Sequence, residues 1–143
     1  MLAQGYTPEQ NILEASVDAD GIVLLTISGR ITNAHMDAVL EWIEKVKLTL
    51  QTAADTKVEP ILVVCDVSGV THFETKPVAA LRDLLSYDKK FPLVTAVVGP
   101  NNMIQMLVDA LISLTRRTNI KQFPAKKEAL DWLLSNRHTT TPK

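Results

Sequence analysis

Cysteine, aromatic residues and net charge are all scarce in this chain of 143 residues. It has one cysteine, Cys65, so no internal disulfide can form, and an unpaired thiol favours a reducing compartment such as the cytoplasm. The 15 basic and 16 acidic side chains leave a net charge of −1, which gives no general attraction to nucleic acid or anionic lipid. Because 46% of the residues are hydrophobic, the composition predicts one globular domain rather than a disordered chain.

Signals for secretion and membrane insertion are also missing. Residues 1–8 have neither a basic start nor an apolar stretch long enough for a signal peptide. The most apolar window, residues 103–114, is interrupted by polar residues and is shorter than the ~20 residues that span a bilayer. We therefore expect no transmembrane segment, a single domain over residues 10–135, and tails at residues 1–9 and 136–143.

Motifs for catalysis, cofactors and metals are not found. The three histidines, His35, His72 and His138, lie in different predicted elements and have no cysteine or acidic partner at metal-ligand spacing. The chain has no glycine-rich nucleotide loop and no nucleophile elbow. Cys65 lies in an apolar run, where we expect it to be buried and inert. The sequence therefore predicts a protein that is not an enzyme, with no catalytic residue, cofactor or metal.

Strand-like and helix-like hydrophobic patterns alternate along the chain. A hairpin signal at Asp18 to Gly21 separates the first two strands, and a two-faced pattern follows from Met36. The predicted strands cover residues 12–17, 22–27, 61–65, 93–98 and 120–123. The predicted helices cover residues 36–50, 78–87, 103–117 and 125–135. The order β-β-α-β-α-β-α-β-α predicts an α/β domain with a mostly parallel sheet, a leading antiparallel strand and packed helices.

The segment from Asp66 to Pro77 carries the most specific pattern in the chain. It reads Asp-Val-Ser-Gly-Val-Thr-His-Phe-Glu-Thr-Lys-Pro and leads from a predicted buried strand into a predicted helix. This segment resembles the STAS family of sulfate-transporter and anti-sigma-factor-antagonist domains, in which Asp-Leu-Ser-x-Val precedes an Asp-Ser-Ser-Gly turn. Residues 24–32 resemble the family's second strand and its exit, and residues 96–99 and 123–133 resemble its SpoIIAA-like branch.

The resemblance implies a single STAS-like domain that binds a protein partner without catalysis. Its partners in signalling would be similar to those of anti-sigma-factor antagonists, namely an anti-sigma factor or a serine kinase. Glu74 falls on the family's turn aspartate and Thr75 on the serine that partner kinases phosphorylate, whereas Lys76 and Pro77 replace the usual Ser-Gly. The implied partner-binding loop contains Asp66, Ser68, Thr71, His72, Glu74, Thr75 and Lys76.

Thr75 is the candidate phosphoacceptor. Because it precedes a predicted helix, its hydroxyl can cap that helix by accepting a hydrogen bond from a free backbone N–H. A phosphate added at the same place would meet the positive end of the helix dipole. It would also add about −1.5 to −2 charges, enough to repel a partner surface built for a neutral loop. The sequence leaves both the cap and the phosphorylation switch open.

The predicted helix from Met103 to Arg116 is apolar over far more than one face. Its polar residues form one narrow stripe, Gln105, Asp109, Ser113 and Arg116. A helix on a sheet needs an apolar face of only about 100°, so other apolar residues must meet something else. They are Met103, Met106, Leu107, Ala110, Leu111 and Leu114.

Three kinds of contact would account for that apolar surface. The first is packing against the second or fourth helix, and the second is a homodimer or partner interface. The third is a roof over an apolar pocket, which gives an alternative function: a carrier of a small apolar ligand or lipid, since STAS-like domains share their topology with the CRAL-TRIO lipid-transfer fold.

Overall fold

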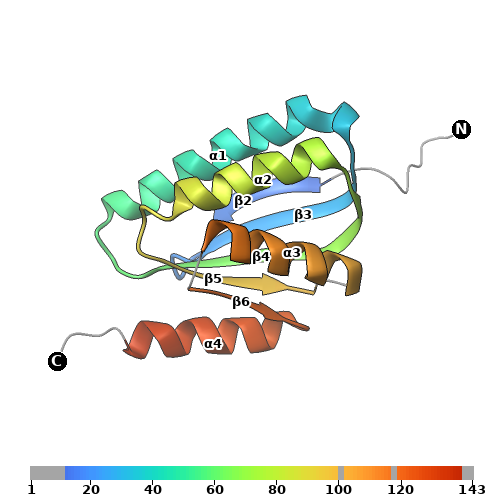
Figure 1. The fold of residues 1–143 in the computed structure, drawn as a ribbon. Helices are drawn as coiled ribbons and strands as arrows, with labels where there is room; N and C mark the ends of the chain where they lie inside the picture. The colour runs from blue at the N-terminus through green and yellow to red at the C-terminus, as the bar shows by residue number, and fades with distance from the viewer. Residues whose placement is uncertain (1–11, 100–101, 117–118, 140–143) are drawn as a thin grey trace, which may run out of the picture.

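A five-stranded sheet forms the centre of the molecule, with the strand order β2-β3-β4-β5-β6. The structure is a computed structural model and describes residues 12–99, 102–116 and 119–139 (Figure 1). The strands are β2 (Ile12–Val17), β3 (Val23–Ile31), β4 (Ile61–Phe73), β5 (Leu93–Val98) and β6 (Ile120–Phe123). β2 is antiparallel to β3, and the other neighbouring pairs are parallel. The predicted single α/β domain with a leading antiparallel strand is confirmed.

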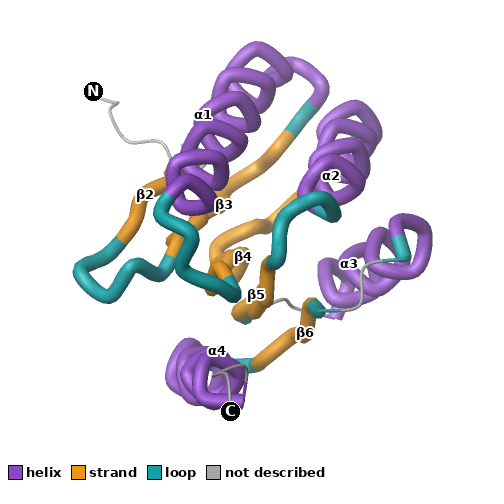
Figure 2. The backbone as a smooth tube through the Cα atoms, turned by 90° about the vertical axis from the view of Figure 1, so that its left-hand side faces the viewer, coloured by secondary structure: helices purple, strands orange, loops and turns teal. Residues whose placement is uncertain are grey.

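Helices cover both faces of this sheet, in unequal numbers. α1, α2 and α3 lie on one face, and α4 lies on the other (Figure 2). The helices are α1 (Met36–Asp55), which follows the 3₁₀ turn η1 (Asn33–His35), α2 (Thr75–Asp88), α3 (Asn102–Thr115) and α4 (Lys126–Thr139). α4 runs past Ser135, so the boundary expected at residue 136 falls inside a helix, while the tail expected at 1–9 lies outside the described residues.

Two apolar layers hold the helices on the sheet. In β4 successive side chains point to opposite faces, so Val63 joins the cluster beneath α1 and α2, and Val64 joins the cluster beneath α4. Central strand β5 is buried at all six positions because both of its faces are covered. This double coverage explains why the sequence of β5 is an apolar run without alternation.

The β2–β3 hairpin, whose strand β2 forms one edge of the sheet, is held by side-chain hydrogen bonds at two places. In its turn, Asp18 Oδ1 accepts hydrogen bonds from the backbone N–H groups of Asp20 at 2.8 Å and Ile22 at 3.0 Å. In its strand, the Glu14 carbonyl accepts a hydrogen bond from Trp42 Nε1 at 2.9 Å. Trp42 belongs to α1, so this helix holds the edge strand as well as covering the sheet.

Strand β4 departs most from the predicted elements. The sequence placed its end at Cys65 and a loop from Asp66 onward, but β4 continues to Phe73, which pairs with Ile31 of β3. The prediction of a loop over residues 66–73 is therefore wrong. The β3–β4 ladder continues beyond the fully buried part of the strands and supplies backbone hydrogen bonds to a segment whose polar side chains are typical of a loop.

Candidate functional site

A groove of about 680 Å³ lies between α2 and α3, and we call it the α2–α3 groove. Its α2 wall is formed by Thr75, Val78, Ala79 and Arg82. Its α3 wall is formed by Leu107, Leu111 and Leu114. Asn33, Phe73 and Glu74 also line it. Both walls show spacings of three and four residues, so each presents one helix face over about two turns, or about 10 Å.

The groove brings together two surfaces that the sequence had suggested separately. Thr75 starts the α2 wall, and Leu114, which is 69% exposed, ends the α3 wall. Leu111 is only 5% exposed and lies deeper in the groove. α3 packs beside α2, whereas α4 lies across the sheet, so the second helix and not the fourth is the packing partner (Figure 2).

Two other predicted residues of α3 remain outside the groove. Met106 is 74% exposed and Ala110 is also exposed, and neither lines the groove. The side chain of Met103 lies outside the described residues. The apolar surface of α3 is therefore divided between a buried base, a groove wall and a separate exposed strip.

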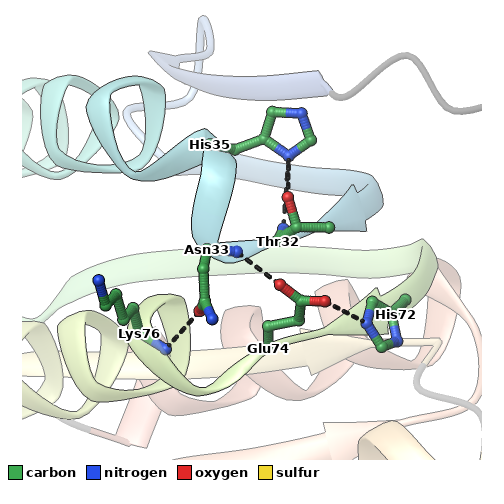
Figure 3. Close-up of polar contacts among 6 residues, drawn as sticks. All are labelled: Thr32, Asn33, His35, His72, Glu74 and Lys76. Atoms are coloured by element: carbon green, nitrogen blue, oxygen red, sulfur yellow. Dashed lines mark hydrogen bonds and ion pairs between the residues drawn. The ribbon is translucent and has the colours of Figure 1, made fainter.

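At one end of the groove, Asn33 is hydrogen-bonded to both Glu74 and Lys76 (Figure 3). Glu74 Oε1 accepts a hydrogen bond from the Asn33 backbone N–H at 2.7 Å, and Asn33 Oδ1 accepts one from the Lys76 N–H at 3.0 Å. His72 Nε2 lies 3.1 Å from Glu74 Oε2 and donates to it, because a carboxylate can only accept. These bonds join η1, at the exit of β3, to the start of α2.

The same contacts favour the ionised form of Glu74. The hydrogen bond from the Asn33 amide, followed by that from His72, holds the pKa of the Glu74 carboxyl below the ordinary value of 4.5. A carboxyl whose pKa is lowered by folding contributes stability above its ordinary pKa, and this contribution is lost as the pH falls through the lower folded value. Glu74 is therefore a fixed negative charge at neutral pH.

The titration of Glu74 directly tests the hydrogen bonds that it accepts from Asn33 and His72. In a carbon-detected NMR titration we expect the Glu74 carboxyl to titrate below 4.5. In His72→Ala its pKa should rise but stay below that value, because the Asn33 amide remains and is the larger cause. A wild-type pKa at or above the ordinary value would contradict the observed hydrogen bonds.

Thr75 is the first residue of α2 and not its cap. The N-cap position is occupied by Glu74, so the interpretation of Thr75 as the capping residue is wrong. The amides expected to receive a phosphate are also largely occupied: the Lys76 N–H bonds to Asn33, and Pro77 has none. Thr75 is exposed, lines the groove and follows the ionised Glu74, so a phosphate on its hydroxyl would add a second negative charge at this end of the groove.

The other residues of the predicted partner-binding loop lie apart from the groove. Asp66 Oδ1 accepts hydrogen bonds from the Ser68 N–H at 2.9 Å and the Ser68 hydroxyl at 2.6 Å, within strand β4. Thr71 is exposed on the same strand. The Lys76 side chain lines a second groove, between α1 and α2. Of the seven residues predicted from Asp66 to Lys76, Glu74 and Thr75 line the α2–α3 groove, and His72 acts on it through Glu74.

Sequence reasoning missed five residues that line the groove: Asn33, Phe73, Val78, Ala79 and Arg82. Val78 and Arg82 were not singled out, although they follow Thr75 at intervals of three and seven and so share its helix face. Asn33 was not among the predicted site residues either. No local pattern connects Asn33 with Glu74, because their contact depends on the pairing of β3 with β4.

A small apolar cavity of about 90 Å³ lies beneath the groove. Cys65 lines it, and burial, with smaller effects of the Asp66 and Asp88 charges, raises the pKa of the Cys65 thiol to about 12. The thiolate is therefore not available as a nucleophile at neutral pH. Phe73, Leu107 and Leu111 line both spaces, so the cavity and the groove adjoin at these side chains.

The described residues show neither a metal-binding cluster nor a membrane-spanning helix. They contain no group of three or more His, Cys, Asp or Glu side chains placed to hold a metal ion. Among the helices that the structure describes, none combines the length and the apolar character needed to cross a membrane.

Comparisons with solved structures identify the fold. No protein-family model matches the sequence, and no curated protein matches it. An uncharacterized protein from the DUF3478 family of Shewanella loihica PV-4, with a SpoIIAA-like fold, superposes with a TM-score of 0.57 at 19% identity, over 90% of this chain and 99% of that one. This chain has a SpoIIAA-like fold. The STAS-like architecture implied by the sequence resemblance is thereby confirmed at the level of fold.

A second solved structure, that of SLC26A9, shares this SpoIIAA-like fold over part of its length. The TM-score is 0.55 at 19% identity, and the match covers 83% of this chain but only 20% of SLC26A9. The present chain thus corresponds to about a fifth of that protein. Both likenesses concern the fold, and the function has to be argued from the groove.

Proposed function

We propose that this protein is a non-enzymatic, cytoplasmic signalling module that binds a protein partner in the α2–α3 groove, similar to an anti-sigma-factor antagonist. The observation that carries the proposal is that Thr75 and the exposed Leu114 lie on facing walls of one groove. An exposed apolar surface with a polar rim is typical of a protein-binding site. The partner class is an anti-sigma factor or a serine kinase.

Phosphorylation of Thr75 would act as the switch of this site. The phosphate would stand beside ionised Glu74 and would have to be buried against apolar Val78 and the leucines of α3 when a partner binds. Burial of that charge is costly and like charges repel, so the modification should release the partner.

Affinity purification with matched variants tests the proposed function. The tagged chain is expressed in its own host as wild type, Leu114→Lys and Leu48→Lys, since Leu48 on α1 is 68% exposed and lies outside the groove. We expect the same partner with wild type and L48K, and at least a tenfold loss with L114K, because a buried unpaired charge opposes binding. Identical partners in all three samples would exclude the groove as the binding surface.

The switch is tested in the same purification with Thr75→Ala and Thr75→Glu. T75A should retain the partner and T75E should lose it, and mass spectrometry of the wild type should find a phosphate on the peptide that contains Thr75. Equal capture by both variants would remove the switch from the proposal and leave the binding surface in place.

The carrier alternative has less support from the cavity. The apolar cavity of about 90 Å³ is smaller than the engineered cavity of about 150 Å³ that holds one benzene molecule. A lipid chain would require the helices to separate from the sheet. Native mass spectrometry of protein purified from cells would reveal a bound lipid if such a rearrangement occurs.

A further inference from the structure

The shape of the α2–α3 groove selects a helix as its occupant. Both walls are helix faces, and a third helix can place its side chains between their ridges at the usual interaxial distance of about 8–10 Å. An extended peptide is a poor fit, because the backbone groups within α2 and α3 are already bonded inside their own helices. The buried N–H and C=O groups of such a peptide would have no partners.

The polar residues of the groove place opposite charges at its two ends. Glu74 lies at the start of α2 and is ionised at neutral pH, as shown above. Arg82 lies two turns further along the same helix, and its Nη2 lies 3.4 Å from Oδ1 of neighbouring Asp83, with both side chains exposed. Glu74 and Arg82 are the only two charged residues among the described residues that line the groove. A partner with the complementary charges needs a basic end beside Glu74 and an acidic end beside Arg82.

This charge pattern also determines the direction of the partner helix. Acidic side chains stabilise the N-terminal turn of a helix and basic side chains stabilise its C-terminal turn. A helix with its acidic first turn beside Arg82 and its basic last turn beside Glu74 runs antiparallel to α2. In that direction its negative C-terminal end also lies next to the positive N-terminal end of α2. Side-chain charge and helix dipole therefore favour the same orientation.

From this complementarity we infer that the α2–α3 groove binds an amphipathic helix of a protein partner, antiparallel to α2, with its acidic end at Arg82 and its basic end at Glu74. The inference rests on the proposed function and specifies the partner's chemistry. Three apolar side chains spaced over two turns of the partner would contact Val78, Leu107 and Leu114. A second copy of the chain is a poorer occupant, because it would present the same concave groove where a ridge is needed.

Two synthetic helices distinguish this orientation. Both are about 16 residues long, share one composition and carry leucines at i, i+3 and i+7, and hydrocarbon staples give them equal helicity. The forward peptide has glutamates in its first turn and lysines in its last, and the reversed peptide has the opposite arrangement. By fluorescence anisotropy we expect the forward peptide to bind wild-type protein about tenfold more tightly, as for a few exposed charge pairs.

Charge-reversal variants test whether the preference for the forward peptide arises in the groove. Arg82→Glu should reduce it to about threefold or less, whereas Lys89→Glu, with the same charge change outside the groove, should leave it unchanged. Absence of binding by the forward peptide, or a preference that R82E does not alter, would overturn the inference. So would a dimer in sedimentation velocity that L114K dissociates, since the groove would then belong to a second copy. If the peptides fail but partner capture still depends on Leu114, the proposed function stands without the helical partner.

Discussion

Replacing Leu111 with alanine should lower the free energy of unfolding by about 3 kcal/mol, whereas Leu114→Ala should change it by less than about 0.5 kcal/mol. Leu111 is 5% exposed and lines both the cavity and the groove, so truncation would enlarge an existing space of about 90 Å³. Leu114, three residues along the same helix, is 69% exposed and has little contact to lose. Urea denaturation of both variants, monitored by circular dichroism, measures the two changes in the free energy of unfolding.

Comparison of L111A with L114A also distinguishes the apolar residues of α3 that stabilise the core from those that bind a partner. Both substitutions exchange leucine for alanine in one helix, so the change in helix propensity is the same and cancels in the comparison. L114A should retain its stability and bind the partner less well. If L114A were as destabilising as L111A, Leu114 would be part of the core, and the groove would lose the exposed wall on which the proposed function depends.

The fold was predictable because its signals are local or periodic. The apolar runs of β4 and β5 indicated strands covered on both faces, and Asp18 to Gly21 indicated the hairpin. The extension of β4 beyond Cys65 was not predictable, since the side chains of Asp66 and Ser68 are typical of loops. Asp66 is held in the sheet by pairing with Thr26 of β3 and Val98 of β5, both far away in sequence, and Ser68 lies at the register shift that follows.

The candidate site was predictable only in part, for the same reason. Thr75 was found through the resemblance to STAS domains, and the excess apolar surface of α3 through its composition. That the two face each other follows from the adjacent positions of α2 and α3 on one face of the sheet, which no local pattern encodes. Arg82 was within reach of sequence reasoning, because it shares a helix face with Thr75, whereas Asn33 was not.

Gly99 follows the end of β5 and lies close to Ser68 of β4. Its φ of +77° is a left-handed conformation, which costs a residue with a Cβ about 1–2 kcal/mol. A Cβ added there would also lie 2.5 Å from Ser68 Cβ and 3.1 Å from Ser68 Cα, so side chain and backbone would both have to move. Overpacking of this kind typically costs about 1–3 kcal/mol more. The two penalties arise from independent causes and should add.

Gly99→Ala is therefore expected to lower the free energy of unfolding by about 2–5 kcal/mol. Gly21→Ala is the matched control: Gly21 has a similar φ of +81°, but no atom lies within 4 Å of the added Cβ. It should cost only about 1–2 kcal/mol, so the difference between the two variants in urea denaturation measures the steric contribution of Ser68. If both variants lost the same free energy of unfolding, β4 would be able to move away at Ser68 without loss of stability. The contact between Gly99 and Ser68 would then be less rigid than its packing indicates.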